Sequence, residues 1–171
     1  MKDIVSTIVS VFLFISASSL LSGCGGSGSS GSTSTTGTAT GGGGATYGAL
    51  TLTDTGTAVT GTTFNAHSRL AITSSGITVT QWYNIDLAAG TTYPYVVLIV
   101  TQDSLGTVTG VTISNMISTG TASDQWVTAP APATSEVSAT ATTVTFTNLV
   151  VPGYAAASTT TSLTLNGSLR F

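Results

Sequence analysis

Hydrophobic and polar residues alternate along most of the chain after residue 46. The clearest run extends from Ile77 to Leu87, where every second residue is apolar except Gln81. A period of two residues is typical of a β-strand with one face in the core and the other in solvent. We therefore predict a strand over 77–87 whose solvent face carries Thr78, Thr80, Trp82, Asn84 and Asp86.

Similar alternating or continuously apolar runs recur at short intervals. The segment 93–101 is apolar on both faces, which is typical of a strand inside a sandwich. The further strands that we predict are 47–53, 58–64, 69–73, 107–117, 136–139, 143–151 and 162–171. No segment after residue 24 keeps a helical period over three turns. About nine strands separated by turn signals are typical of an antiparallel β-sandwich, so the predicted class is all-β.

The last segment requires a choice between two structures. Asn166-Gly167 is a strong signal for a two-residue hairpin turn. A continuous strand instead places Leu163, Leu165, Leu169 and Phe171 on one face, whereas a hairpin mixes the faces. We therefore predict one unbroken strand in which Gly167 marks a bulge or a close approach of two backbones.

The first 23 residues have a different composition. Lys2 precedes an apolar or small-residue run from Ile4 to Leu21, which ends in small residues before Cys24. This order of charged, apolar and small regions is typical of a secretory signal peptide. A membrane-spanning helix is the alternative, but serines interrupt the run and no basic cluster follows it.

The end of this segment, Leu21-Ser22-Gly23-Cys24, resembles the lipobox of bacterial lipoproteins. The resemblance implies cleavage before Cys24, attachment of a diacylglycerol to its thiol and acylation of its new amino group. It also implies a lipid-anchored protein of the cell envelope. Because Gly25 rather than Asp follows the cysteine, it implies delivery to the outer membrane in a Gram-negative host.

Residues 24–45 join this anchor to the predicted domain, 46–171. Beyond Cys24 the segment contains no charge and no side chain larger than threonine. Such a composition buries too little apolar surface to offset the entropy of ordering, so we predict a flexible linker. A Gly/Ser-type coil of this length spans about 25 Å on average, enough to lift the domain from the bilayer.

The charge content excludes several classes of function. Only 5% of residues are charged, and the three Lys and Arg residues are too few for the basic surface of a nucleic-acid-binding protein. One Cys and one His exclude a zinc site built from these residues, and we expect no cofactor. Calcium could use Asp103, Asp124 or Glu136, but these acids form no Asp-x-Asp run. The 36 Thr and 23 Ser supply the polar surface instead.

Catalysis needs titratable side chains that converge, and the sequence offers few. His67 is the only histidine, and the acidic residues lie far apart, mostly at predicted turns. A turn Asp usually bonds its own backbone. We therefore predict no catalytic residue and no enzyme, with a small hydrolase as a distant alternative.

The candidate ligand-binding residues are Trp82, Asn84, Asp86 and Trp126. An indole among hydroxyl, amide and carboxylate groups could stack on a sugar or hold a peptide. The alternative is that a loop or second sheet covers this face and makes Trp82 part of the core. The expected function is a non-catalytic envelope lipoprotein with a structural, interaction or adhesion role and a protein or glycan partner. A carbohydrate-binding module using the Trp82 face is the alternative.

Overall fold

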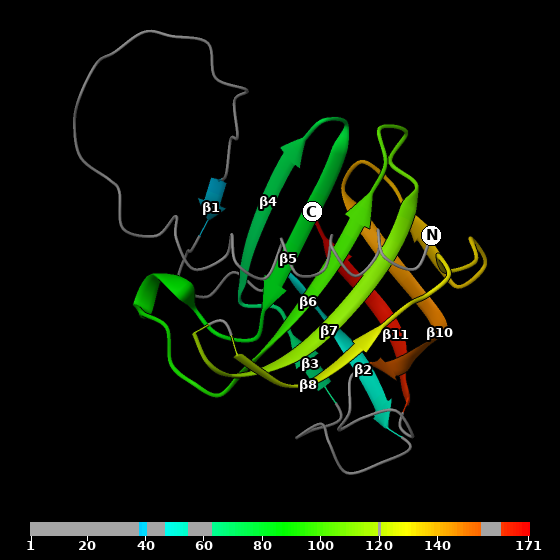
Figure 1. The fold of residues 1–171 in the computed structure, drawn as a ribbon. Coiled ribbons are helices and arrows are strands. Elements are labelled where there is room, and N and C mark those ends of the chain that lie inside the picture. The colour runs from blue at the N-terminus through cyan, green and yellow to red at the C-terminus, as the bar shows by residue number, and fades with distance from the viewer. Residues whose placement is uncertain (1–37, 41–46, 55–62, 120, 155–161) are drawn as a thin grey trace, which may run out of the picture.

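The computed structural model describes residues 38–40, 47–54, 63–119, 121–154 and 162–171. These residues form an all-β fold, as predicted (Figure 1). Its strands are β1 (Thr38–Thr40), β2 (Gly48–Asp54), β3 (Thr63–Asn65), β4 (Ser68–Ser74), β5 (Ile77–Tyr83), β6 (Tyr95–Gln102), β7 (Val108–Ser118), β8 (Thr121–Val127), β9 (Val137–Ala139), β10 (Thr143–Tyr154) and β11 (Ser162–Arg170). Every pair is antiparallel, in the order β1-β4-β5-β6-β7-β8-β10-β11-β2-β3, with β9 also on β10.

Strand β10 joins the two halves of this sheet. Its residues from Thr143 to Pro152 pair with β11, whereas Gly153 and Tyr154 pair with β8. The sheet curls at this strand, so that the half with β4 to β8 faces the half with β9, β10, β11, β2 and β3 (Figure 1). The result resembles a sandwich, with the main core between the halves.

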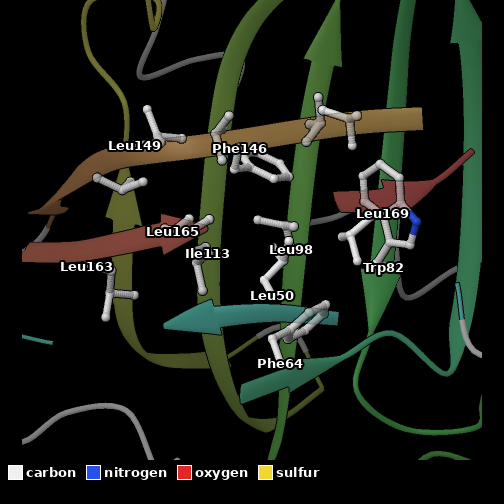
Figure 2. Close-up of a cluster of buried hydrophobic side chains, with 14 of the residues drawn as sticks. Leu50, Phe64, Trp82, Leu98, Ile113, Phe146, Leu149, Leu163, Leu165 and Leu169 are labelled. Atoms are coloured by element: carbon white, nitrogen blue, oxygen red, sulfur yellow. The ribbon is translucent and has the colours of Figure 1, made fainter. Parts of the chain in front are cut away.

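The main core is built mostly from large aliphatic and aromatic side chains. Figure 2 shows Phe146 and Leu149 on β10 and the leucines of β11 facing Leu98 and Ile113 on the opposite half. Full burial of one such side chain stabilises the fold by about 1.5–3 kcal/mol. The alternating leucines of β11 are therefore a main reason why this strand closes the core.

The C-terminal strand is unbroken, which confirms its prediction from the alternating leucines. Leu163, Leu165 and Leu169 are all fully buried. Gly167 has a φ of 126°, and a Cβ built on it would lie 2.7 Å from the Ala49 carbonyl oxygen. This is the close backbone approach that the sequence predicted, and it explains why only glycine fits there.

A β-bulge lies opposite the Asn166-Gly167 pair. Phe146 pairs with Gly167 and Leu149 pairs with Leu165, so two residues of β10 oppose Asn166 alone. One of them, Asn148, has a φ of 50°, and its N–H donates to the Asn166 side-chain oxygen at 2.8 Å. The Asn166 side chain thus accepts a backbone hydrogen bond from the bulged strand, and Asn166 does not form a turn.

Three strand predictions differ from the structure. Strand β5 ends at Tyr83, and a 3-10 helix from Leu87 to Ala89 replaces the predicted end of that strand. Strand β8 was not predicted, because Ser123, Asp124 and Gln125 hide its alternation. Strand β1 lies within the segment predicted as a linker, where no strand was predicted. Their pairing with β4 covers backbone groups that an edge strand leaves unpaired.

Several predictions fall outside the described residues. These are the signal peptide 1–23, the lipobox with Cys24, the rest of the linker and the first part of the strand predicted over 58–64. In the ranges that the structure describes, no helix has the length and apolarity needed to cross a bilayer.

Candidate functional site

The two tryptophans are buried in the main core. Trp82 pairs with Leu98, Leu98 with Ile113 and Ile113 with Trp126 across four consecutive strands. Both indoles have no exposed surface, and they lie three strand spacings apart, about 14 Å. The prediction that Trp82 lies on a solvent face with Trp126 as a possible neighbour is therefore wrong. The alternative was that a loop or second sheet covers this face and makes Trp82 part of the core. Trp82 is part of the core, and the other half of the same curled sheet covers it.

The physical reason is that alternation shows which residues share a face but not which face is buried. Thr80 shares a face with Trp82 and is 1% exposed, although its hydroxyl suggested solvent. The opposite face of the same half-sheet has a smaller apolar cluster around Tyr83, Val97 and Met116. Both faces of this half-sheet therefore carry buried side chains.

The remaining two predicted ligand-binding residues hold the connection between β5 and β6. The Asn84 side-chain oxygen accepts the Val96 N–H at 2.8 Å. An Asp86 carboxylate oxygen accepts the Ala88 N–H at 2.9 Å and begins the 3-10 helix. The four predicted residues therefore form no common site, since two lie in the core and two bond the backbone.

Two of the acidic residues considered for calcium, Asp103 and Glu136, have similar local roles. One oxygen of Asp103 accepts the N–H groups of Leu105 and Thr107, each at 2.9 Å. Glu136 accepts the Ala133 N–H at 3.2 Å, and His67 is exposed. Within the described ranges, no three His, Cys, Asp or Glu side chains gather in a way that could hold a metal ion.

A cleft of about 520 Å³ opens at one end of the core, and we call it the Arg69 cleft. One wall comes from the half-sheet with β4 to β6. Arg69 and Ala71 extend from β4, Thr78 and Thr80 from β5, and Gln102 from the end of β6. Each lies on the face that points toward the other half of the sheet, because Arg69 pairs with Trp82 and Ala71 with Thr80.

The opposite wall is smaller and mostly apolar. Ala139 ends β9, Thr140 and Ala141 lie in the turn between β9 and β10, and Phe171 follows β11. The rim is the turn between β6 and β7, where the Gln102 amide donates to the Gly106 carbonyl oxygen at 2.9 Å. The alanines leave the space that larger side chains would fill.

The Trp82 indole packs against the Phe171 ring and holds it in place. The two ring centroids lie 5.5 Å apart with the planes tilted by 41°. The Trp82 indole N–H also donates to the Arg170 carbonyl oxygen at 3.0 Å. Trp82 therefore contributes to the cleft indirectly, by fixing the residue that forms part of its wall.

Arg69 carries the only charged side chain among the described residues that line the cleft. Its guanidinium carbon lies 5.6 Å from the centroid of the Tyr47 ring, the geometry of a cation–π contact. Its Nε–H is buried and has no hydrogen-bond partner in the described part of the chain. A buried donor without an acceptor is uncommon in folded proteins and is a reason to look for a missing partner.

Our search of the sequence for functional residues did not select Arg69. One signal could have found it: the chain contains only two arginines, and Arg69 alternates with Ala71 on one face of a predicted strand. Comparison with protein-family models, curated proteins and solved structures found no match. The residues of the cleft are the part of the described chain that suggests a function. Their arrangement can bind a small molecule between hydroxyl, guanidinium and apolar groups.

Proposed function

We propose that this chain is an exported, lipid-anchored protein of the cell envelope whose β domain binds a small molecule without chemical conversion. The resemblance of Leu21-Ser22-Gly23-Cys24 to a lipobox supports the anchor. The Arg69 cleft supports the binding role. A carbohydrate-binding face on Trp82 is not part of the proposal, because that indole is buried.

The observation that carries the binding role is a cleft that combines space with a mixed polar and apolar lining around Arg69. A volume of about 520 Å³ lies within the range of known small-molecule sites, about 300–1,000 Å³. Such sites are mainly apolar, with a few polar groups that orient the ligand. The Arg69 cleft has this composition, with threonine hydroxyl groups, the Gln102 amide and Arg69 as its polar groups.

A binding role is favoured over hydrolysis by the positions of the titratable groups. General acid–base catalysis requires a side chain within hydrogen-bond reach of the reacting atom. Asp86, Asp103 and Glu136 each accept backbone N–H groups near their own positions in the chain. Within the described residues, Arg69 carries the only ionisable side chain that lines the cleft.

Membrane fractionation of cells that express the full chain tests the anchor. Cys24→Ser removes the thiol that would carry the lipid, so the protein should leave the membrane fraction. Ser22→Ala keeps a small residue at its lipobox position and should remain with the membranes. Unchanged membrane association of Cys24→Ser would count against the anchor.

A fragment screen tests the binding role. The full chain in detergent is screened by ligand-observed NMR against small charged and neutral compounds. Ala71→Trp fills the cleft and should abolish the hits, whereas Ser74→Trp, at an exposed position of the same strand, should keep them. The binding role is wrong if no compound binds, or if Ala71→Trp retains every hit.

A further inference from the structure

We infer that Asn166 is a deamidation site, which the pairing of β11 with β10 and β2 keeps unreactive in the folded domain. When β11 opens, the Asn166 side chain cyclises with the Gly167 nitrogen, and the isoaspartate that follows prevents the strand from forming again. The inference concerns a covalent modification of the chain and is independent of the proposed binding role.

The sequence identifies which asparagine reacts. Deamidation begins when the backbone nitrogen of the next residue attacks the side-chain amide carbon, and a side chain on that next residue hinders the attack. Asn166 is followed by glycine. The other four asparagines are followed by alanine, isoleucine, methionine and leucine, and they are Asn65, Asn84, Asn115 and Asn148. Asn166 is therefore the asparagine that reacts fastest when the backbone is free to move.

The reaction releases ammonia and consumes water. The Gly167 nitrogen bonds to the Asn166 Cγ, the Cγ–Nδ2 bond breaks, and the proton of the Gly167 nitrogen leaves with the ammonia. The product is a five-membered succinimide ring, which water opens at either of its two carbonyl carbons. One opening gives aspartate with the normal backbone. The other gives isoaspartate, in which the backbone runs through the former side chain and is one methylene longer.

The folded structure prevents the attack in two ways. The Asn166 side-chain oxygen accepts the Asn148 N–H at 2.8 Å, which holds the amide beside the bulge of β10. The extended backbone of a strand also turns the next nitrogen away from the side chain, so the attack requires rotation of the peptide group after Asn166. Gly167 pairs with Phe146 on β10 and with Leu50 on β2, and this rotation breaks both pairings. The rate of deamidation therefore follows the population of molecules in which β11 is open.

The isoaspartate product does not fit the register of β11. Leu165 and Leu169 lie on either side of Asn166, and both are fully buried on one face of the strand. An additional methylene in the backbone between them shifts one leucine relative to the other, so both cannot occupy their core positions. Aspartate keeps the backbone length, and its carboxylate can accept the Asn148 N–H as the amide does. The two products therefore differ in their ability to fold.

Peptide mass spectrometry of the full chain tests the protection. The chain in detergent is incubated at mildly alkaline pH, with and without guanidinium chloride at a concentration that unfolds it. Asn166 should deamidate at least about tenfold faster in the denaturant, and the other four asparagines should stay mostly intact. Gly167→Ala in the same denaturant is the chemical control and should slow the reaction at Asn166. Equal rates in the folded and the unfolded chain overturn the inference.

Two matched variants test the role of the bulge. Asn148 has a φ of 50°, which valine disfavours and glycine accepts. In buffer without denaturant, Asn148→Val should deamidate at Asn166 at least about fivefold faster than Asn148→Gly, because its β11 opens more often. Equal rates in the two variants contradict protection by the bulge. If Asn148→Val does not fold, the comparison of the folded and unfolded unmodified chain decides the question.

Refolding distinguishes the two products. The deamidated chain is diluted out of the denaturant, and size-exclusion chromatography separates the compact from the expanded and aggregated molecules. Isoaspartate at position 166 should be depleted at least about tenfold from the compact fraction, because exposure of one buried leucine costs more than this factor in stability. Asn166→Asp has the normal backbone and should fold. Isoaspartate and asparagine in equal proportion in the compact fraction, or failure of Asn166→Asp to fold, would refute the account of the products.

Discussion

The indole nitrogen of Trp82 donates a 3.0 Å hydrogen bond to the backbone carbonyl oxygen of Arg170, 88 residues further along the chain. This bond joins β5 in one half of the curled sheet to the end of β11 in the other. The ring of Phe171 packs on the same indole at 5.5 Å. One buried side chain therefore connects the two halves and supports the wall of the Arg69 cleft.

Trp82→Phe should destabilise the protein by about 2–4 kcal/mol, because it removes the buried hydrogen bond to the Arg170 carbonyl oxygen and leaves a small cavity behind. Urea unfolding of the full chain in detergent measures the change. Tyr154→Phe, at a position that is 44% exposed, serves as the control and should change stability by less than about 0.5 kcal/mol. An equally small effect of Trp82→Phe would show that this bond does not hold the halves together.

Gly167→Ala should destabilise the protein by about 2 kcal/mol or more, because its φ is 126° and its Cβ would lie 2.7 Å from the Ala49 carbonyl oxygen. Gly110→Ala is the matched control, since the nearest atom to its Cβ is the Thr101 Cβ at 3.9 Å. That substitution should be neutral or stabilise by about 0.5–1 kcal/mol. Similar midpoints for the two variants in urea would contradict the close backbone approach.

The bulge in β10 makes a separate prediction. Asn148 has a φ of 50°, so Asn148→Gly should change stability by less than about 0.5 kcal/mol, whereas the β-branched Asn148→Val should cost about 1–3 kcal/mol. Asn166→Ala removes the acceptor of the Asn148 N–H and should cost about 1 kcal/mol. Thermal unfolding of the three variants measures the order of their stabilities. An Asn148→Val variant as stable as Asn148→Gly would contradict the prediction.

Three tyrosines on the outer face of the β4–β8 half make stability depend on alkaline pH. Burial, and secondly the nearby Tyr95, raises the pKa of Tyr83 well above its ordinary value. Burial, and then the charge and hydrogen bond of Tyr93, raises the pKa of Tyr95 to about 12. The folded state therefore favours the neutral phenols. Stability should be full below about pH 10, where unfolded tyrosine is neutral, and should fall as the pH rises toward about 12.

Urea unfolding at a series of alkaline pH values measures this fall. Tyr83→Phe and Tyr95→Phe each remove one phenol with a raised pKa and should make the loss of stability with pH shallower. Tyr154→Phe, at an exposed site away from this cluster, should keep the steeper profile. If all three variants match the unmodified chain, the tyrosine cluster does not control the alkaline stability.

The strands that alternation predicted well have one strongly apolar face. In β11, the spacing of Leu163, Leu165 and Leu169 outweighed the turn signal of Asn166-Gly167, because a hairpin would have exposed buried leucines. In β8, the polar residues Ser123, Asp124 and Gln125 interrupt the alternation of apolar residues, so the strand was not predicted. Its formation depends on pairing with β7 and β10, which are distant in sequence from one another.

The candidate site was less predictable than the fold. Trp82 attracted attention because an aromatic ring among hydroxyl groups suggests a binding surface, but the other half of the sheet covers it. Arg69 attracted none, although a lone cation beside the core is the more informative feature. Local patterns do not reveal that the β9–β10 turn and Phe171 lie across a cleft from it.

The sequence by itself determined the all-β class, most strand positions and the continuity of the last strand, because these depend on local alternation and on the demand to bury one face. The tertiary structure alone decided which face of β5 is inside and where β8 pairs. It also decided that Arg69, Thr80 and Phe171 share one cleft. These properties depend on how β10 joins the two halves of the sheet, and that contact is made between residues far apart in the chain.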